Sequence, residues 1–214
     1  MTATADTRIR RLPERGGHEF ETACAIIDAA YLCHVGFTLD GQPYVVPMAC
    51  AREGDQLLMH GSVVSRMLRQ AADGLPVCAT VTHLDGMVLA RSAFHSSMNY
   101  RSVMIFGQAR EVTDPQAKSR GLDRLVEQLS PGRVAEVRPS KPKEFNATSL
   151  LALPIETFST KVRTGPPDEP AYDLDEPAWA GVVPMSLAWG DPIDAPDLTN
   201  GMSPPAWARK QAPK

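Results

Sequence analysis

The sequence predicts a mainly β domain with helices, of the α+β class, whose antiparallel strands form a barrel. Short apolar runs rich in β-branched residues recur between residues 31 and 112 and again over 148–163. Hairpin-type turns such as Asp40-Gly41 join several of these runs, and helical periodicity interrupts them in only a few places. Strands joined by hairpins favour an antiparallel sheet over a parallel α/β sheet.

The first elements are expected in the order helix, strand, turn, strand, strand. Residues 18–30 place apolar side chains at helical spacing and carry acidic residues near the start, where the helix dipole favours them. Residues 31–51 then form two strands around Asp40-Gly41, and residues 56–61 form the next strand. We therefore predict a short amphipathic helix followed by a three-stranded meander.

A second helix is predicted over residues 62–74. Ser62 suits the N-cap, Met67 and Leu68 share an apolar face, and Gly74 ends the helix. Two further strands, 76–84 and 86–92, are expected on either side of an Asp85-Gly86 turn, and residues 94–112 supply another strand.

A third helix is predicted over residues 114–132, and a final strand with a proline interruption over 148–163. The expected buried residues of this third helix are Leu122, Leu125, Val126 and Leu129. Proline-rich sequence begins at Gly165, so we divide the chain into a mobile arm (1–17), a barrel domain (18–164) and a proline-rich C-terminal tail (165–214). This tail is expected to pack on the barrel or on a partner subunit, because Trp179 and Trp189 give it side chains to bury.

Composition excludes several classes of function. The 214 residues hold 22 Lys and Arg against 25 Asp and Glu, a net charge of -3, which argues against general nucleic-acid binding. Neither a membrane-spanning apolar run nor a signal peptide is evident, so we expect a cytoplasmic protein with no membrane partner. The four cysteines lack metal-site spacing and are interpreted as reduced thiols; we assign no metal ion.

Two polar stretches are candidates for a binding site. Residues 59–66 (MHGSVVSR) run from a strand into a helix, where Ser62, Ser65 and Arg66 could bind a phosphate; a simple cap with a solvated arginine is the alternative. Residues 99–102 offer an amide, an aromatic ring, a guanidinium and a hydroxyl, although an exposed edge strand would show the same pattern. His60 could donate a proton beside a bound ring, but a histidine at a strand end is more often structural.

Residues 31–163 resemble the FMN-binding split β-barrels related to pyridoxamine 5'-phosphate oxidase. The resemblance rests on GQPYVVPMACA, LLMHGSVVSRML and NYRSVMIFG in the family's order, with STKVRTGPP and WAGVVP later in the chain. The branch that contains nitroimidazole-resistance proteins looks nearest. The arginine- and histidine-rich closing motif of the true oxidase is not reproduced by STKVRTGPPDEP, so we do not expect oxidation of pyridoxamine phosphate.

The resemblance implies an FMN cofactor bound at the interface of a homodimer. It assigns the phosphate to Ser65 and Arg66, the ribityl chain and ring to a turn of three residues, and His60 of that turn also to catalysis. The complete cofactor-binding set comprises Pro47, Met48, His60, Gly61, Ser62, Ser65, Arg66, Asn99, Tyr100, Arg101, Ser102 and Lys161. The pocket above the flavin is expected between the His83 to His95 region, the N-terminal helix and the proline-rich tail of the other chain.

The predicted function is FMN-dependent oxidoreduction between a reduced nicotinamide and a small acceptor such as a nitroaromatic or quinone. The flavin carries this chemistry, while the protein supplies position and electrostatics. A flavin- or haem-binding module used for carriage or sensing is the alternative, and a deazaflavin-dependent reductase is another. A pocket for binding and a pocket for catalysis need the same phosphate-binding residues, so the sequence leaves these alternatives open.

Overall fold

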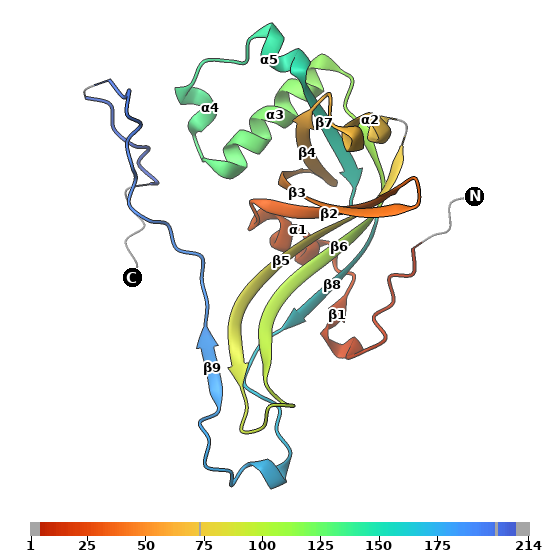
Figure 1. Cartoon of the computed structure of the whole chain (residues 1–214), viewed down its shortest axis with the longest axis vertical. Coiled ribbons are helices and arrows are strands. Elements are labelled where there is room, and N and C mark those ends of the chain that lie inside the picture. Colours follow the sequence, from red (N-terminus) through yellow and green to blue (C-terminus); the bar gives the residue numbers. More distant parts are fainter. Residues whose placement is uncertain (1–4, 73, 200, 209–214) are drawn as a thin grey trace.

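The barrel of the computed structural model, which describes residues 5–72, 74–199 and 201–208, is a ring of antiparallel strands (Figure 1). The pairings run β2–β3–β4–β7–β6–β5 and return to β2. The strands of the ring are β2 (Leu32–Leu39), β3 (Gln42–Glu53), β4 (Gln56–Ser62), β5 (Leu75–Leu89), β6 (Ser97–Glu111) and β7 (Thr148–Pro154). The predicted mainly β fold with an antiparallel barrel is confirmed.

The long strands β5 and β6 leave the ring and continue into an extension below it (Figure 1). There β8 (Thr157–Arg163) pairs with β6, β1 (Gly16–Gly17) pairs with β8, and β9 (Gly181–Pro184) pairs with β5. One edge of β5 is thus shared by β2 and β9, and one edge of β6 by β7 and β8. This sharing splits the barrel.

Two Asp-Gly pairs predicted as turns have different outcomes. Asp40 and Gly41 both adopt positive φ, 51° and 79°, as the tight hairpin between β2 and β3 requires. Asp85-Gly86 is not a turn: β5 continues through it as one strand, with a register shift between Leu84 and Gly86. The predicted strands 76–84 and 86–92 are therefore one bulged strand.

The described residues form the helices η1 (Pro13–Arg15), α1 (Phe20–Asp28), α2 (Arg66–Ala72), α3 (Pro115–Leu129), α4 (Arg133–Glu136), α5 (Pro142–Ala147) and η2 (Ala171–Asp173). Of these, α1, α2 and α3 lie close to the three predicted helices, with changes at the ends, whereas the other short helices were not predicted. Ser62 is not an N-cap, because it ends β4 and its carbonyl accepts a bond from the Ser65 N–H. Burial of Val126 and Leu129 was predicted wrongly, since both are substantially exposed on α3. Residues 148–163 form two strands rather than one interrupted strand.

Two groups of buried side chains hold these elements together. The barrel interior contains residues of the ring strands together with Ile26 and Ile27 of α1 and Met67 and Leu68 of α2. A smaller group lies between α3 and the outer face of the ring, where Leu125 meets residues of β3, β4 and β7. All four cysteines are free thiols.

In this structure the proline-rich tail packs on the barrel of the same chain. After β9, the Trp189 ring packs edge-on against Tyr31 with centroids 5.4 Å apart, and Trp207 packs in the same way on Trp189. Nearer the extension, the buried Glu169 carboxylate accepts bonds from the backbone N–H and the guanidinium of Arg91. The domain boundaries, the mobility of the arm and contact with a partner subunit stay predictions; residues 1–4, 200 and 209–214 of these segments lie outside the described residues.

Helices in the described part of the chain are too short or too polar to cross a membrane.

Candidate functional site

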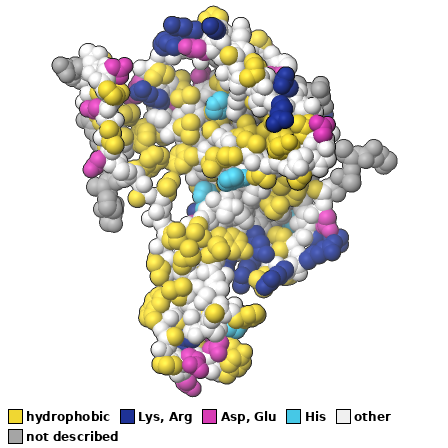
Figure 2. Space-filling model, viewed as in Figure 1, with side chains coloured by type: hydrophobic (Ala, Val, Ile, Leu, Met, Phe, Trp, Pro, Cys, Tyr) yellow, Lys and Arg dark blue, Asp and Glu magenta, His cyan; other side chains and the backbone are white. Residues whose placement is uncertain are grey.

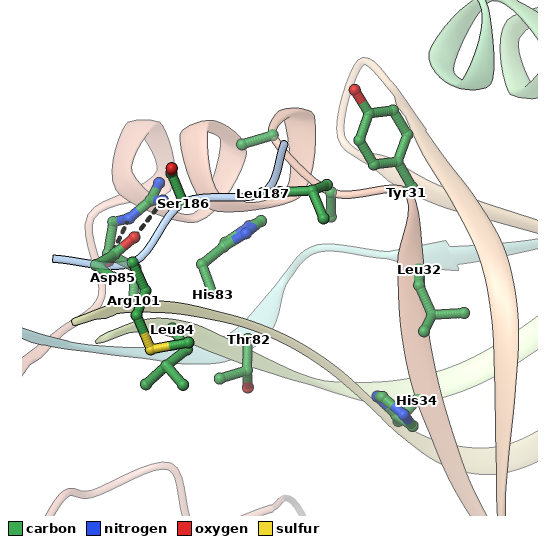
Figure 3. Close-up of a pocket in the computed structure, with 13 residues that line it drawn as sticks. Tyr31, Leu32, His34, Thr82, His83, Leu84, Asp85, Arg101, Ser186 and Leu187 are labelled. Carbon is green, nitrogen blue, oxygen red and sulfur yellow. Dashed lines mark hydrogen bonds and ion pairs between the residues drawn. The ribbon is translucent and has the colours of Figure 1, made fainter. Parts of the chain in front are cut away.

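A cavity of about 740 Å³ opens where the ring meets the extension (Figure 3). Four separate stretches of chain form its walls: the end of α1 with the start of β2, residues 82–85 of β5, Arg101 of β6, and the tail segment 185–187. Leu32, Leu84, Met185 and Leu187 make much of this wall apolar. A cavity of this size that combines apolar walls with several polar side chains is typical of a site for a cofactor or an organic ligand.

Two histidines lie on the cavity wall. His83 sits below Ser186 and Leu187, and one ring nitrogen, Nε2, lies 2.9 Å from the Ile26 carbonyl oxygen. This contact fixes the ring and leaves the other nitrogen for a ligand. His34 is exposed on β2, in the neighbouring strand of the ring. Imidazole nitrogens in an apolar cavity are suited to binding a metal centre such as a haem iron.

The wall formed by Ala29 and Ala30 is held in place from outside. Asp28 at the end of α1 accepts two bonds from the Arg52 guanidinium of β3, at 2.9 and 2.5 Å. The Gln128 side chain of α3 donates to the carbonyls of Asp28 and Ala30, both at 2.8 Å. Arg52 and Gln128, which are distant in sequence from Ala29 and Ala30, therefore hold this wall of the cavity against the ring.

A second, smaller hollow of about 160 Å³ holds the predicted phosphate-binding pair. Ser65 and Arg66 line it together with Tyr44 and apolar side chains of β2 and β3. The Arg66 guanidinium carbon lies 6.0 Å from the centre of the Tyr44 ring, at the outer limit of a cation–π contact. An exposed cation and a hydroxyl at the edge of a hollow could bind a phosphate group.

The residues predicted as a turn, His60 to Ser62, instead form the end of strand β4, and His60 among them has an unusual environment. His60 Nδ1 is buried, and no protein partner for it is found in the described part of the chain. Burial lowers the pKa of His60 below its ordinary 6.5, because the charged form is poorly solvated there. Close packing favours glycine at position 61, because a Cβ there would lie 2.6 Å from Leu68 Cδ1.

The Asn99 side chain is used inside the protein. Its amide nitrogen donates to the Gly165 carbonyl at 3.1 Å, and its oxygen accepts a bond from the buried Arg163 guanidinium. Arg163 also donates to the Pro166 carbonyl at 3.0 Å. These bonds hold the chain in place at Gly165 and Pro166, where the proline-rich tail begins. They also leave the Asn99 amide little capacity for a cofactor.

The remaining predicted residues are spread over several strands. Ser102 donates to the Lys161 carbonyl at 3.3 Å, and Lys161 Nζ donates to the Arg11 carbonyl at 3.1 Å. Pro47 is exposed opposite His34 in the β2–β3 pairing. The Met48 side chain points into the core, and Tyr100 lies opposite Leu84.

A single chain therefore brings together only part of the predicted set. Ser65 and Arg66 share the small hollow, whereas Arg101 belongs to the large cavity with His83 and Asp85. The expected contribution of the N-terminal helix to a pocket fits this cavity, but the tail that lines it belongs to the same chain. His83 and Asp85 fall within the stretch from His83 to His95 that was expected to line a pocket, whereas His34 was not predicted, because nothing in its local sequence marks a site.

Comparisons with known proteins identify the family. The sequence profile described as pyridoxamine 5'-phosphate oxidase matches residues 19–162. A solved structure described as the FAD and heme binding protein from Mycobacterium smegmatis is 39% identical with a TM-score of 0.87, covering 92% of this chain and 97% of that one. The flavocytochrome Anf3 from Azotobacter vinelandii is 37% identical with a TM-score of 0.89, covering 96% of both chains.

A protein assigned to 5-nitroimidazole antibiotic resistance, from Bacteroides thetaiotaomicron VPI-5482, is more distant. It is 24% identical with a TM-score of 0.57 over 69% of this chain and 86% of that one, so the likeness concerns the fold alone. Comparison with curated protein sequences found no match. Because the profile covers about two thirds of the sequence and the barrel has the expected strand pairing, the chain belongs to the pyridoxamine 5'-phosphate oxidase family.

Proposed function

We propose that this protein binds a flavin and a haem and works as a redox protein of the flavocytochrome type. The observation that carries the proposal is the cavity walled by the tail and containing His34 and His83. A bound flavin supplies one- and two-electron chemistry and a haem supplies one-electron chemistry. The chain's part is to bind both groups and to hold them in place.

The tail connects this cavity to the comparisons. The family profile ends at residue 162, and nearly a quarter of the chain lies beyond that point. The match to the Mycobacterium smegmatis protein leaves less than a tenth of this chain unmatched, so it extends over most of the tail. A likeness that includes the segment lining the cavity supports a ligand similar to those named for that protein, FAD and heme.

The flavin phosphate is assigned to Ser65 and Arg66. Arg69 is also exposed on α2, three residues after Arg66 and hence on the same side of the helix. Two arginines suit the diphosphate of FAD, whereas the predicted FMN needs only one phosphate site. His60, whose buried Nδ1 has no partner among the described residues, lies on the preceding strand and could hydrogen-bond a flavin or substrate.

The haem is assigned to the large cavity, with His83 as the iron ligand. The contact with the Ile26 carbonyl orients the His83 ring, an arrangement common among metal-binding histidines. His34 offers a second imidazole on the same cavity. The remaining wall is apolar enough to exclude water from one face of a porphyrin.

The experiment that tests this proposal is an absorbance spectrum of the full chain after reconstitution with hemin and flavin. We expect a Soret band and a flavin band, loss of the Soret band in His83→Ala, and a shifted Soret maximum in His34→Ala. Mass analysis of the released flavin separates FAD from FMN and from a deazaflavin. A wild-type protein that takes up neither hemin nor any flavin would refute the proposal.

Oxidation of a reduced nicotinamide with a nitroaromatic or quinone acceptor is a narrower activity that the same preparation tests. Steady nicotinamide consumption by the flavin-loaded protein would make it an enzyme of the predicted kind. A flavin that is held but not reduced by the nicotinamide would favour a role in electron carriage or sensing.

We also infer that the protein is a homodimer. Hydrophobic side chains gather on the side of the extension that carries β9 (Figure 2). Met87, Leu89, Met98 and Val183, on β5, β6 and β9, are each 40–48% exposed. Monomeric proteins rarely leave such apolar strands in water, because they promote association. Light scattering should give twice the chain mass of 23.2 kDa, and a monomer at micromolar concentration would contradict the inference.

A further inference from the structure

Asp85 is the extra residue of a β-bulge at one end of the large cavity. Leu84 pairs with Tyr100 and Gly86 pairs with Asn99, so Asp85 has no counterpart on β6. Its carbonyl oxygen accepts a bond of 3.0 Å from the Met185 N–H of the tail. Bulges commonly redirect a side chain near a functional site, and here the redirected group is a carboxylate on the cavity wall.

The Asp85 carboxylate holds the Arg101 guanidinium by two bonds. Arg101 Nε donates to Oδ2 and Nη2 donates to Oδ1, both at 2.9 Å (Figure 3). These bonds lower the pKa of Asp85, so the carboxylate is charged at neutral pH. Because a guanidinium has five N–H donors, three remain after this pairing. Both side chains line the cavity and are about one third exposed, so these donors are accessible to a ligand.

The surroundings of Arg101 define what the cavity can accept. His83 lies directly across from Arg101 in the β5–β6 register. Leu84 and Met185 lie nearby, and Leu32 and Leu187 make up the rest of the apolar wall. The ligand that fits is a flat, apolar molecule with an anionic group at one edge. Its ring would contact the apolar wall and its anion would contact Arg101.

We propose that Arg101, positioned by Asp85, is the anchor for a carboxylate of the ligand in this cavity. This inference rests on the proposed function: for a haem bound through His83, the carboxylate is a propionate. Asp85 acts through Arg101 as a positioning residue, since it fixes the plane of the guanidinium. Its own negative charge weakens the attraction of Arg101 for a ligand carboxylate, while the three N–H groups that Asp85 does not use stay available.

The test compares hemin with hemin dimethyl ester, which has the same ring without the negative charges. Each is titrated into the haem-free full chain, and the Soret absorbance gives the two dissociation constants. The wild-type protein should bind hemin about tenfold more tightly than the ester, which is the low end of what one charge-assisted hydrogen bond contributes. Arg101→Gln should bind both nearly equally, and Asp85→Asn should prefer hemin at least as strongly as the wild-type protein does.

Controls separate this effect from misfolding. Arg110→Gln removes an exposed arginine from the same strand outside the cavity and should keep the tenfold preference. Arg101→Lys keeps the charge but loses the planar fork, so it should show an intermediate preference. If Arg101→Gln fails to fold, the wild-type ratio and the Lys variant still decide the question.

The outcomes are distinguishable from failure of the proposed function. A wild-type protein that binds neither compound refutes the haem assignment itself. A wild-type protein that binds both with equal affinity, or an Arg101→Gln variant that keeps the full preference for hemin, leaves the haem in place and overturns the role of Arg101.

Discussion

Replacement of Trp189 by alanine should release the tail segment that forms one wall of the large cavity. Trp189 makes two edge-on aromatic contacts, with Tyr31 at 5.4 Å and 79° and with Trp207 at 5.4 Å and 69°. Each such pair contributes about 0.5–1.5 kcal/mol beyond the burial of its surface. Loss of both therefore costs the docked tail about 1–3 kcal/mol, which raises the population of undocked tail about 5- to 150-fold.

Hydrogen exchange measures this population directly. The Met185 N–H is bonded to the Asp85 carbonyl, so it exchanges only when the tail leaves β5. In Trp189→Ala, exchange over residues 185–187 should accelerate by the factor above while the ring strands stay protected. Where hemin is bound, its transfer to an excess of apomyoglobin should accelerate in parallel.

Two variants serve as controls for the tail. Trp189→Phe keeps an aromatic ring between Tyr31 and Trp207, so it should retain most of the protection. Ile193→Ala changes a side chain that is 96% exposed and should leave exchange unchanged. If Trp189→Ala exchanges like the wild-type protein, the aromatic contacts do not hold the tail and the reasoning is refuted.

Three further changes test other parts of the site. Arg66→Ala should weaken flavin binding about 10- to 100-fold in a fluorescence titration without lowering Tm, and an unchanged affinity would remove Arg66 from the site. Burial lowers the pKa of His60 in the folded chain, so the unfolded chain binds its proton first as pH falls; wild-type stability to urea should therefore drop as pH falls below about 6.5, and His60→Gln should flatten this dependence. Gly86→Val should displace β9, because a Cβ there would lie 2.9 Å from the Val183 carbonyl oxygen; faster exchange at Val183 checks this, and Gly190→Ala, in open space, is the control.

The two Asp-Gly pairs show how far local sequence predicts the fold. Asp40-Gly41 and Asp85-Gly86 carry the same hairpin signal, yet only the first is a turn. At the second, Arg101 binds the Asp85 carboxylate and β9 packs closely on Gly86. Both contacts come from other parts of the chain. Periodicity and turn residues therefore predict strands well, but a bulge that resembles a turn is distinguished only by its tertiary partners.

The two candidate sites also differ in how far local sequence predicts them. Ser65 and Arg66 are neighbours in sequence, so the hollow that they line could be proposed as a phosphate site from one short segment. The large cavity is built from residues 29–32, His34, residues 82–85, Arg101 and residues 185–187, and no segment by itself contains enough polar groups to signal a site. For this reason His83 was predicted only as one end of a stretch that lines the flavin pocket, and not as a ligand by itself. Its significance depends on the Ile26 carbonyl, which lies 57 residues away along the chain.

We expect the tail to determine the ligand more than the barrel does, because the two parts contribute differently to the cavity. The ring strands and α1 belong to the part matched by the family profile, whereas Met185, Ser186 and Leu187 lie beyond it. A split barrel without these residues would present His83 and Arg101 on an open surface, where water competes for an imidazole and a guanidinium. With the tail bound at Asp85 and Tyr31, the same groups are less exposed to water and lie beside apolar side chains, where charge-assisted bonds are stronger. Differences in ligand among proteins of this fold should therefore follow the tail more closely than the barrel.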